Sequence, residues 1–277
     1  QIAHGLAEHS GRYARFAQRL TDHGYAVYAN DHRGHGASLR TGEDPGHLAD
    51  EDGWNHAVAD VNQLSEHIAR EHPETTRVLF GHSMGSFLVQ QIMYEHPTAA
   101  NAIIMSGSNG KPPPIATLGR GVARIERLRL GKKGQSALIN ALSFGEYNKA
   151  FKPTRTEFDW VSRDESTVDA YISDPLCGFI CSIQSWVDLL DALPALTASH
   201  NLALIPKTTP VYIFSGDRDP VGEMGRGVKR LVAAYRRAWL TDVTLKIYEG
   251  GRHEMLNETN RDEVTANVLQ WLDTVLQ

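Results

Sequence analysis

The sequence is poor in cysteine, has no long apolar run and carries no excess of basic residues. Its 277 residues include two cysteines, Cys177 and Cys181, whose spacing is not a common zinc pattern. A disulfide framework is therefore not expected, and a reducing compartment such as the cytoplasm is favoured. No apolar stretch approaches the roughly 20 residues of a membrane-spanning helix. The formal net charge of −5 argues against a nucleic-acid partner.

The sequence does contain a regular alternation of strand and helix patterns. Apolar strand patterns cover 25–31, 76–82, 101–108, 211–217 and 243–250, and "QIAHG" at 1–5 resembles the end of another strand. Helical patterns cover 11–24, 55–72, 84–96, 225–239 and 260–277. Apolar strands that alternate with helices predict an α/β fold, a mostly parallel sheet with helices on both faces.

The alternation is interrupted once. Residues 109–209 hold short helical patterns and turns, so we predict a helical cap inserted into a core of residues 1–108 and 210–277. Segment 117–133 has two predicted faces, one apolar and one basic: Leu118, Val122, Ile125 and Leu128; Arg120, Arg124 and Arg127. The segment is either a lid that buries acyl chains and touches a lipid surface, or an ordinary cap helix with a solvated basic face.

A short motif stands at the joint of a predicted strand and a predicted helix. "GHSMG" at 81–85 follows the strand pattern and opens an apolar helix. Tight turns use glycine and serine for ordinary reasons, but Gly-x-Ser-x-Gly in this place is the pattern of a nucleophile elbow. The glycines would give room to crossing elements, and the strained corner would expose the Ser83 hydroxyl.

Candidate partners of Ser83 follow two later strands. Asp217 and Asp219 come after strand 211–217, and His253 follows strand 243–250. The carboxyl ends of parallel strands gather at one edge of the sheet, where open α/β sheets place their sites. The chain order Ser, Asp, His is the one expected when a nucleophile elbow precedes its partners.

Five segments resemble the α/β-hydrolase superfamily, and within it the monoacylglycerol lipase and lysophospholipase branch, which shares its family with serine aminopeptidases. They are "HGLAEHSGRY", "NDHRGHGAS", "GHSMGS", "SGDRDPVG" and "RHEMLNE". The resemblance implies an eight-stranded sheet with a helical cap after the sixth strand. It also implies a strand pair before "QIAHG", which we expect to be absent because the chain opens in the middle of that pattern.

The resemblance also implies roles for individual residues. Ser83 would be the nucleophile, and His253 its general base. Asp219 would orient His253, since Gly-x-x-Asp-x-Val matches residues 216–221. Pro220 keeps Asp219 extended beyond the turn, whereas Asp217 ends the strand and is expected to bond its own turn.

Further candidates surround these three. The backbone N–H groups of Leu6 and Met84 are the predicted oxyanion hole. Glu8 either contacts substrate or pins its own loop. The predicted pocket residues from the cap are Ile125, Phe179, Ile183 and Trp186. A histidine pair in "DHRGHG" resembles a metal site, but its glycines favour a turn, so neither metal nor cofactor is expected.

The predicted function is hydrolysis of carboxylic esters of monoacyl lipids through an acyl-enzyme. A peptidase or amidase and a short-chain carboxylesterase remain alternatives on the same residues, and a non-catalytic binding protein is a further one. The expected partner is a small lipid ester, with transient contact between the cap and a membrane or micelle. A cytoplasmic location at the membrane periphery fits this interpretation.

Overall fold

A parallel sheet forms the centre of the protein. The computed structural model describes residues 1–39, 45–112 and 115–276. Five parallel strands follow one another in chain order: β1 (Ile2–Ala3), β2 (Val78–His82), β3 (Ala102–Ser106), β4 (Val211–Gly216) and β5 (Val243–Tyr248). The register pairs Ile2 with Phe80, and Val211 with both Ile103 and Val243. This confirms the predicted parallel sheet.

One predicted strand does not form. Residues 25–31 make a single bridge, between Ala29 and Ile2, and otherwise run irregularly along the edge of the sheet. Because β1 has only two residues, it offers this segment no ladder to continue. The described residues thus hold five strands, fewer than the eight that the resemblance implied. Both residues of β1 pair with β2.

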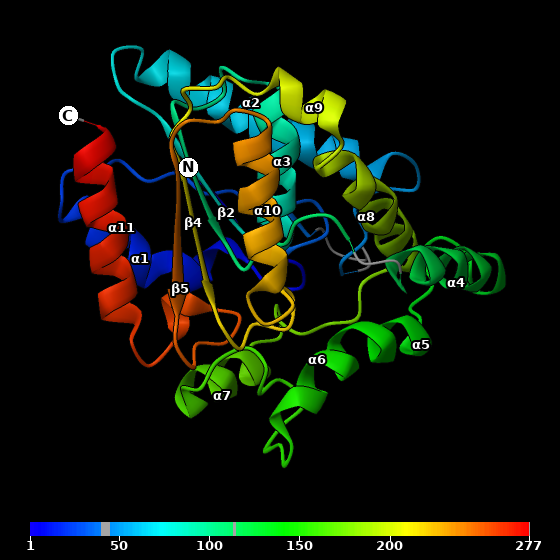
Figure 1. The fold of residues 1–277 in the computed structure, drawn as a ribbon. Helices are drawn as coiled ribbons and strands as arrows, with labels where there is room; N and C mark the ends of the chain where they lie inside the picture. Colours follow the sequence, from blue (N-terminus) through cyan, green and yellow to red (C-terminus); the bar gives the residue numbers. More distant parts are fainter. Residues whose placement is uncertain (40–44, 113–114, 277) are drawn as a thin grey trace.

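Helices cover both faces of the sheet (Figure 1). One face carries α1 (Ala14–Thr21) and α11 (Arg261–Val275), whose apolar side chains share a buried cluster with Phe80 and Phe214. The opposite face carries α2 (Gly53–Glu71), α3 (Met84–Glu95) and α10 (Arg226–Arg237). This layering explains why β3 and β4 are buried along their whole length.

The chain between β3 and β4 builds the cap. It contains α4 (Ile115–Leu130), α5 (Ala137–Asn140), α6 (Glu146–Asn148), α7 (Glu165–Ser173), α8 (Ile183–Leu196) and α9 (Ser199–Leu204). Helices α8 and α9 pack against α2 and α3, and α4 packs on α8. Helices α5 to α7 lie beyond the carboxyl ends of the strands (Figure 1).

Helix α4 presents its arginines to α8 and its apolar side chains to the outside, which neither interpretation of segment 117–133 predicted. Arg120 and Arg124 form ion pairs with Asp191 of α8, each at 2.9 Å. The apolar side chains of Ile125 and Leu128 point outward and are 66% and 85% exposed. The face that carries these arginines lies toward α8, where Asp191 offers a carboxylate, although Arg124 stays largely exposed. Every helix in the described ranges is too short or too polar to cross a membrane.

Candidate active site

Ser83 stands on a strained corner between β2 and α3. Its backbone has φ 50° and ψ −119°, a combination that costs a non-glycine residue energy and is concentrated at functional sites. A Cβ on Gly81 would lie 2.5 Å from the Gly85 carbonyl oxygen, and a Cβ on Gly85 would lie 2.1 Å from the carbonyl oxygen of Ala3. The two glycines therefore allow the strand, the helix and β1 to approach closely, as the motif indicated.

Asp219 and His253 meet behind this corner. The His253 Nδ1 and Asp219 Oδ1 atoms are 2.9 Å apart, and both residues are almost completely buried. Burial alone lowers the pKa of His253, but the charge and hydrogen bond of Asp219, with the charges of Glu254 and Glu8, raise that pKa above its ordinary value. With Nδ1 paired to the carboxylate, Nε2 is the nitrogen left for Ser83.

Asp217 does not reach the histidine ring. Its Oδ1 accepts a hydrogen bond from the Gly250 N–H at 2.7 Å, so the side chain joins the loop that leads to His253. The expectation that Asp217 bonds its own turn is wrong, because the loop after β5 lies closer than that turn. The predicted choice of Asp219 over Asp217 as the hydrogen-bond partner of His253 is confirmed.

His82, the histidine next to Ser83, has a different environment. Its ring lies 4.7 Å from the His253 ring, and its Nδ1 is 3.3 Å from Ser106 Oγ. Burial, and then the charge of His253, lower the pKa of His82 to about 4. Gly107, which sequence reasoning missed, makes room for both rings, because a Cβ there would lie 2.7 Å from His253 Cε1. His82 is thus a neutral neighbour of the pair, and no carboxylate of residues 1–39, 45–112 or 115–276 forms a hydrogen bond with its ring.

A small cavity joins these groups. Its volume is about 70 Å³, and it is lined by residues of the core and the cap: Gly5, Leu6, Glu8, His82, Ser83, Met84, Phe87, Phe144, Tyr147, Trp160, Val161, Tyr171, Trp186, Leu189, Val221, His253 and Glu254. Among the hydrogen bonds of the described residues, none joins Ser83 Oγ to His253, and none uses the N–H of Leu6 or Met84. Leu6 and Met84, the predicted oxyanion-hole residues, thus both line the cavity, and neither N–H has a hydrogen-bond partner in the part of the chain that the structure describes.

Glu8 lines the cavity, but its carboxylate is already engaged. It accepts hydrogen bonds from Gly5 N at 2.5 Å, from the Tyr13 hydroxyl at 2.8 Å and from Arg12 Nη1 at 2.7 Å. Arg12 also forms a bidentate pair with Glu254, at 2.5 and 2.6 Å. The arrangement matches the alternative that Glu8 pins the loop that carries Leu6.

The cap residues that line the cavity differ from most of those predicted. Trp186 lines it as predicted. The structure does not bring Ile125, Phe179 and Ile183 there: Ile125 faces outward, Phe179 packs against His35, and Ile183 is buried in the core. Four aromatic cap residues that sequence reasoning missed line the cavity: Phe144, Tyr147, Trp160 and Tyr171. No local pattern marks them, since they come from short helices and turns in which no repeating spacing indicates the cavity.

The turn "DHRGHG" braces the loop that carries Leu6. The His35 Nε2 accepts a hydrogen bond from Ala7 N at 3.2 Å, while its Nδ1 lies 2.9 Å from the Arg33 carbonyl oxygen. The His32 Nε2 lies 3.1 Å from the His4 carbonyl oxygen. These nitrogens are already occupied by the backbone, as expected of a structural turn.

One group in the described residues has metal-ligand spacing: His9, Asp174 and Cys177, with ligand atoms within 4.8 Å of one another. The His9 Nδ1 accepts a hydrogen bond from Gly11 N, so its Nε2 carries the proton shared with Asp174. Burial raises the pKa of Cys177 to about 12, and a protonated thiol is a poor ligand. These residues do not fit a metal ion well.

A parallel sheet with helices on both faces, a serine on a strand-to-helix corner and an Asp–His pair after two later strands define an α/β hydrolase. The sequence pattern of serine aminopeptidases of type S33 matches residues 1–260, and the chain belongs to this family. It is 31% identical to a monoacylglycerol lipase of Mycolicibacterium smegmatis over 98% of this chain and 86% of that protein. It is 28% identical to human monoglyceride lipase over 96% and 78% of the two chains.

A solved structure shares the whole fold. A thermostable carboxyl esterase from Bacillus coagulans, in complex with glycerol, superposes with a TM-score of 0.92 and 25% identity, over 100% of this chain and 89% of that one. The resemblance noted in the sequence is thereby confirmed for the fold and the family.

Proposed function

We propose that this protein hydrolyses carboxylic esters of monoacyl lipids through an acyl-enzyme, with Ser83, His253 and Asp219 as the catalytic triad. His253 Nε2 takes the proton of Ser83 as the hydroxyl attacks the ester carbonyl, and returns it to the leaving alcohol. Asp219 holds the ring and stabilises the imidazolium. The N–H groups of Leu6 and Met84 stabilise the oxyanion. Water then releases the fatty acid by the same steps.

The observation that carries the substrate class is the lining of the cavity beside Ser83. Its walls are mainly apolar and aromatic: Phe87, Phe144, Tyr147, Trp160, Trp186, Leu189 and Val221. Such a wall fits an acyl chain, and the relatives are named as lipases of monoacylglycerol. At about 70 Å³, the cavity is smaller than the roughly 300 Å³ or more of a typical ligand pocket. Entry of a long acyl chain therefore requires the cap to open.

The peptidase alternative is less well supported. An aminopeptidase needs a carboxylate for the substrate's ammonium group, and the carboxylates that line the cavity are Glu8 and Glu254. Both are paired with Arg12, so a cationic terminus would find their charge compensated. The ester of an uncharged alcohol has no such requirement.

A substrate panel tests the proposal. We expect monoacylglycerols and lysophospholipids, which both carry a long acyl chain, to be hydrolysed with a higher kcat/KM than short p-nitrophenyl esters or aminoacyl amides, because acyl-chain binding supplies transition-state stabilisation that short substrates lack. The measurement is steady-state release of fatty acid, chromophore or amine under matched conditions. Preferred cleavage of the aminoacyl amides would contradict the ester assignment, and turnover confined to the short esters would favour the carboxylesterase alternative.

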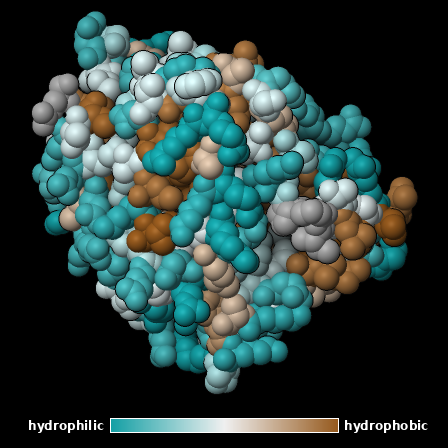
Figure 2. Space-filling view, viewed as in Figure 1, coloured by the Kyte–Doolittle hydropathy of each residue, from teal (hydrophilic) through white to brown (hydrophobic). Residues whose placement is uncertain are grey.

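We further propose that the cap contacts membranes or micelles through its exposed apolar side chains. Five leucine and isoleucine side chains on α4, α5 and the turn that follows are about half exposed or more: Leu118, Ile125, Leu128, Leu138 and Leu142. Figure 2 shows apolar residues gathered at the side of the molecule where α4 and α5 lie. This contact, together with two free, buried cysteines, supports a cytoplasmic enzyme that works at the membrane periphery.

Replacing two of these side chains by charged ones tests the contact. We expect Ile125→Asp combined with Leu128→Asp to lower turnover of monoacylglycerol held in vesicles several-fold, because carboxylates resist transfer into the interface. Turnover of a water-soluble p-nitrophenyl ester should stay unchanged. Trp239→Asp is the matched control, since Trp239 is 79% exposed and follows α10, outside the cap. Equal vesicle activity of all three proteins would contradict the proposed contact.

A further inference from the structure

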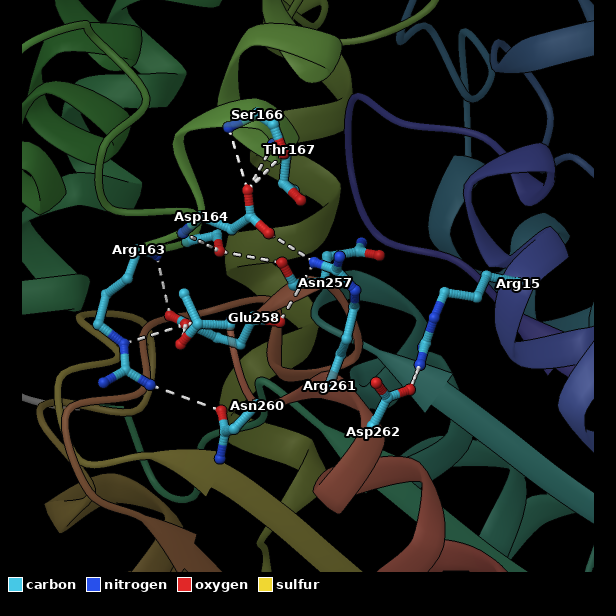
Figure 3. Close-up of polar contacts among 12 residues, drawn as sticks. Arg15, Arg163, Asp164, Ser166, Thr167, Asn257, Glu258, Asn260, Arg261 and Asp262 are labelled. Carbon is cyan, nitrogen blue, oxygen red and sulfur yellow. Dashed lines mark hydrogen bonds and ion pairs between the residues drawn. The ribbon is translucent and has the colours of Figure 1, made fainter.

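The loop that carries His253 is fastened to the cap by one buried carboxylate. Glu258 is fully buried, and its Oε1 accepts hydrogen bonds from the N–H groups of Arg163 and Arg252, both at 3.0 Å. Its Oε2 accepts from Arg163 Nε at 3.0 Å and from Thr259 N at 2.9 Å. Figure 3 shows the Arg163 side chain reaching from the cap to Glu258. A single oxygen thus joins the cap backbone to the residue that precedes His253.

The next two residues of the loop meet the same part of the cap. His253 N donates to the Trp160 carbonyl oxygen at 3.4 Å, and Glu254 N donates to the Val161 carbonyl oxygen at 2.9 Å. The Arg252 guanidinium donates to carbonyl oxygens of the cap as well, at residues 159 and 162. We call residues 159–163 the anchor segment, because it holds the backbone on both sides of His253.

We propose that Glu258 is a positioning residue for His253 and that it acts through the N–H of Arg252 and the anchor segment. This inference rests on the proposed role of His253 as general base. Asp219 fixes one ring nitrogen of His253, but the position of Nε2 also depends on the backbone from which the side chain extends. Glu258 and the anchor segment supply that second support, and the Trp160 ring packs 5.1 Å from the His253 ring.

The chemistry of the site requires a carboxylate at 258. Each oxygen accepts from two N–H groups, whereas the amide group of glutamine has only one oxygen that accepts. In Glu258→Gln, the amide NH₂ would face either the pair Arg163 N and Arg252 N or the pair Arg163 Nε and Thr259 N. Two donors would lose their acceptor in either orientation, which destabilises the local arrangement around the buried side chain.

The neighbouring pair of Asp164 and Arg261 provides a matched control. Arg261 Nη1 donates to Asp164 Oδ2 at 2.5 Å, so this pair also joins the cap to the core (Figure 3). The other oxygen of Asp164 caps α7 by accepting from Ser166 N and Thr167 N. None of the hydrogen bonds found for the Asp164 side chain in the described residues reaches the His253 loop. Asp164→Asn is the same change from carboxylate to amide, and asparagine retains the capping oxygen.

The test compares these two variants in the full chain. The readouts are kcat and KM on a monoacylglycerol and a soluble p-nitrophenyl ester, thermal unfolding, and the low-field proton resonance of the His253 Nδ1–H bonded to Asp219. We expect Glu258→Gln to lower kcat about 100-fold on both substrates, as small misplacements of catalytic groups do, with KM little changed and the resonance broadened or lost. Asp164→Asn should keep both the kcat and the resonance of the unaltered protein.

Two results would overturn the inference: full kcat with an intact resonance in Glu258→Gln, or an equal loss of kcat in Asp164→Asn. If Glu258→Gln fails to fold, Arg163→Lys replaces it. That variant keeps the positive charge and the backbone donor but removes the Nε–H, so a smaller loss of kcat is expected, and no loss counts against the proposal. Failure of the proposed function is distinct, since the unaltered protein would then be inactive and the resonance alone would decide the role of Glu258.

Discussion

Ser83→Ala should abolish ester hydrolysis while the protein remains folded. The substitution removes the oxygen that forms the acyl-enzyme, and losses of a nucleophile in serine hydrolases reach roughly 10⁵–10⁶-fold in kcat. The fold should persist because the Ser83 side chain makes no capping hydrogen bond to α3 and alanine keeps the small size that this corner needs.

The measurement is steady-state kinetics on a monoacylglycerol, with circular dichroism and thermal unfolding as the check on structure. A matched control is Ser86→Ala, one turn further along α3, where the hydroxyl donates to the Ser83 carbonyl oxygen at 2.6 Å and lies outside the cavity lining. We expect this control to retain most of its activity. Substantial turnover by Ser83→Ala would show that the nucleophile is another residue.

Asp219→Asn should cost roughly four orders of magnitude in kcat, as expected when the histidine of a triad loses its carboxylate and adopts the wrong tautomer. Asp217→Asn should cost little, because the asparagine oxygen can still accept the hydrogen bond from Gly250 N that Asp217 accepts now. The two substitutions are chemically identical and lie two positions apart, so each controls for the other. Reversed effects would assign the triad carboxylate to Asp217.

Asp219→Asn should also shift the pH dependence of kcat/KM. His253 must be neutral to accept the Ser83 proton, so activity falls as the pH drops through the pKa of His253. Asp219 raises that pKa, so the acid limb of kcat/KM in the unaltered protein should lie above the ordinary histidine value of about 6.5. In Asp219→Asn, burial remains and lowers the pKa, so the residual activity should extend to lower pH. An acid limb that does not move would contradict the electrostatic coupling.

Sequence by itself determined the features that depend on local pattern. The strand and helix periodicities of 76–96 and 211–217 predicted β2, α3 and β4, since side-chain alternation is a property of the segment itself. Parallel topology then brought three strand ends to one edge, which made Ser83, His253 and the two aspartates at 217 and 219 the candidates. The family pattern Gly-x-x-Asp-x-Val favoured Asp219 between the two aspartates. Glycines at 81 and 85 signalled the close approach at the corner because only the absence of a side chain permits it.

Only the tertiary structure decided which faces are covered and which distant groups meet. Periodicity showed that α4 has an apolar face and a basic face. Which of the two packs on α8 depends on Asp191 of α8, which pairs with the arginines and which no local pattern reveals. The strand pattern at 25–31 does not form a ladder because its neighbour β1 is too short to pair with it. The aromatic side chains that line the cavity, and the hydrogen bond that Arg163 donates to Glu258, bring together segments far apart in the chain. Such long-range contacts depend on packing geometry and are not encoded in residue spacing.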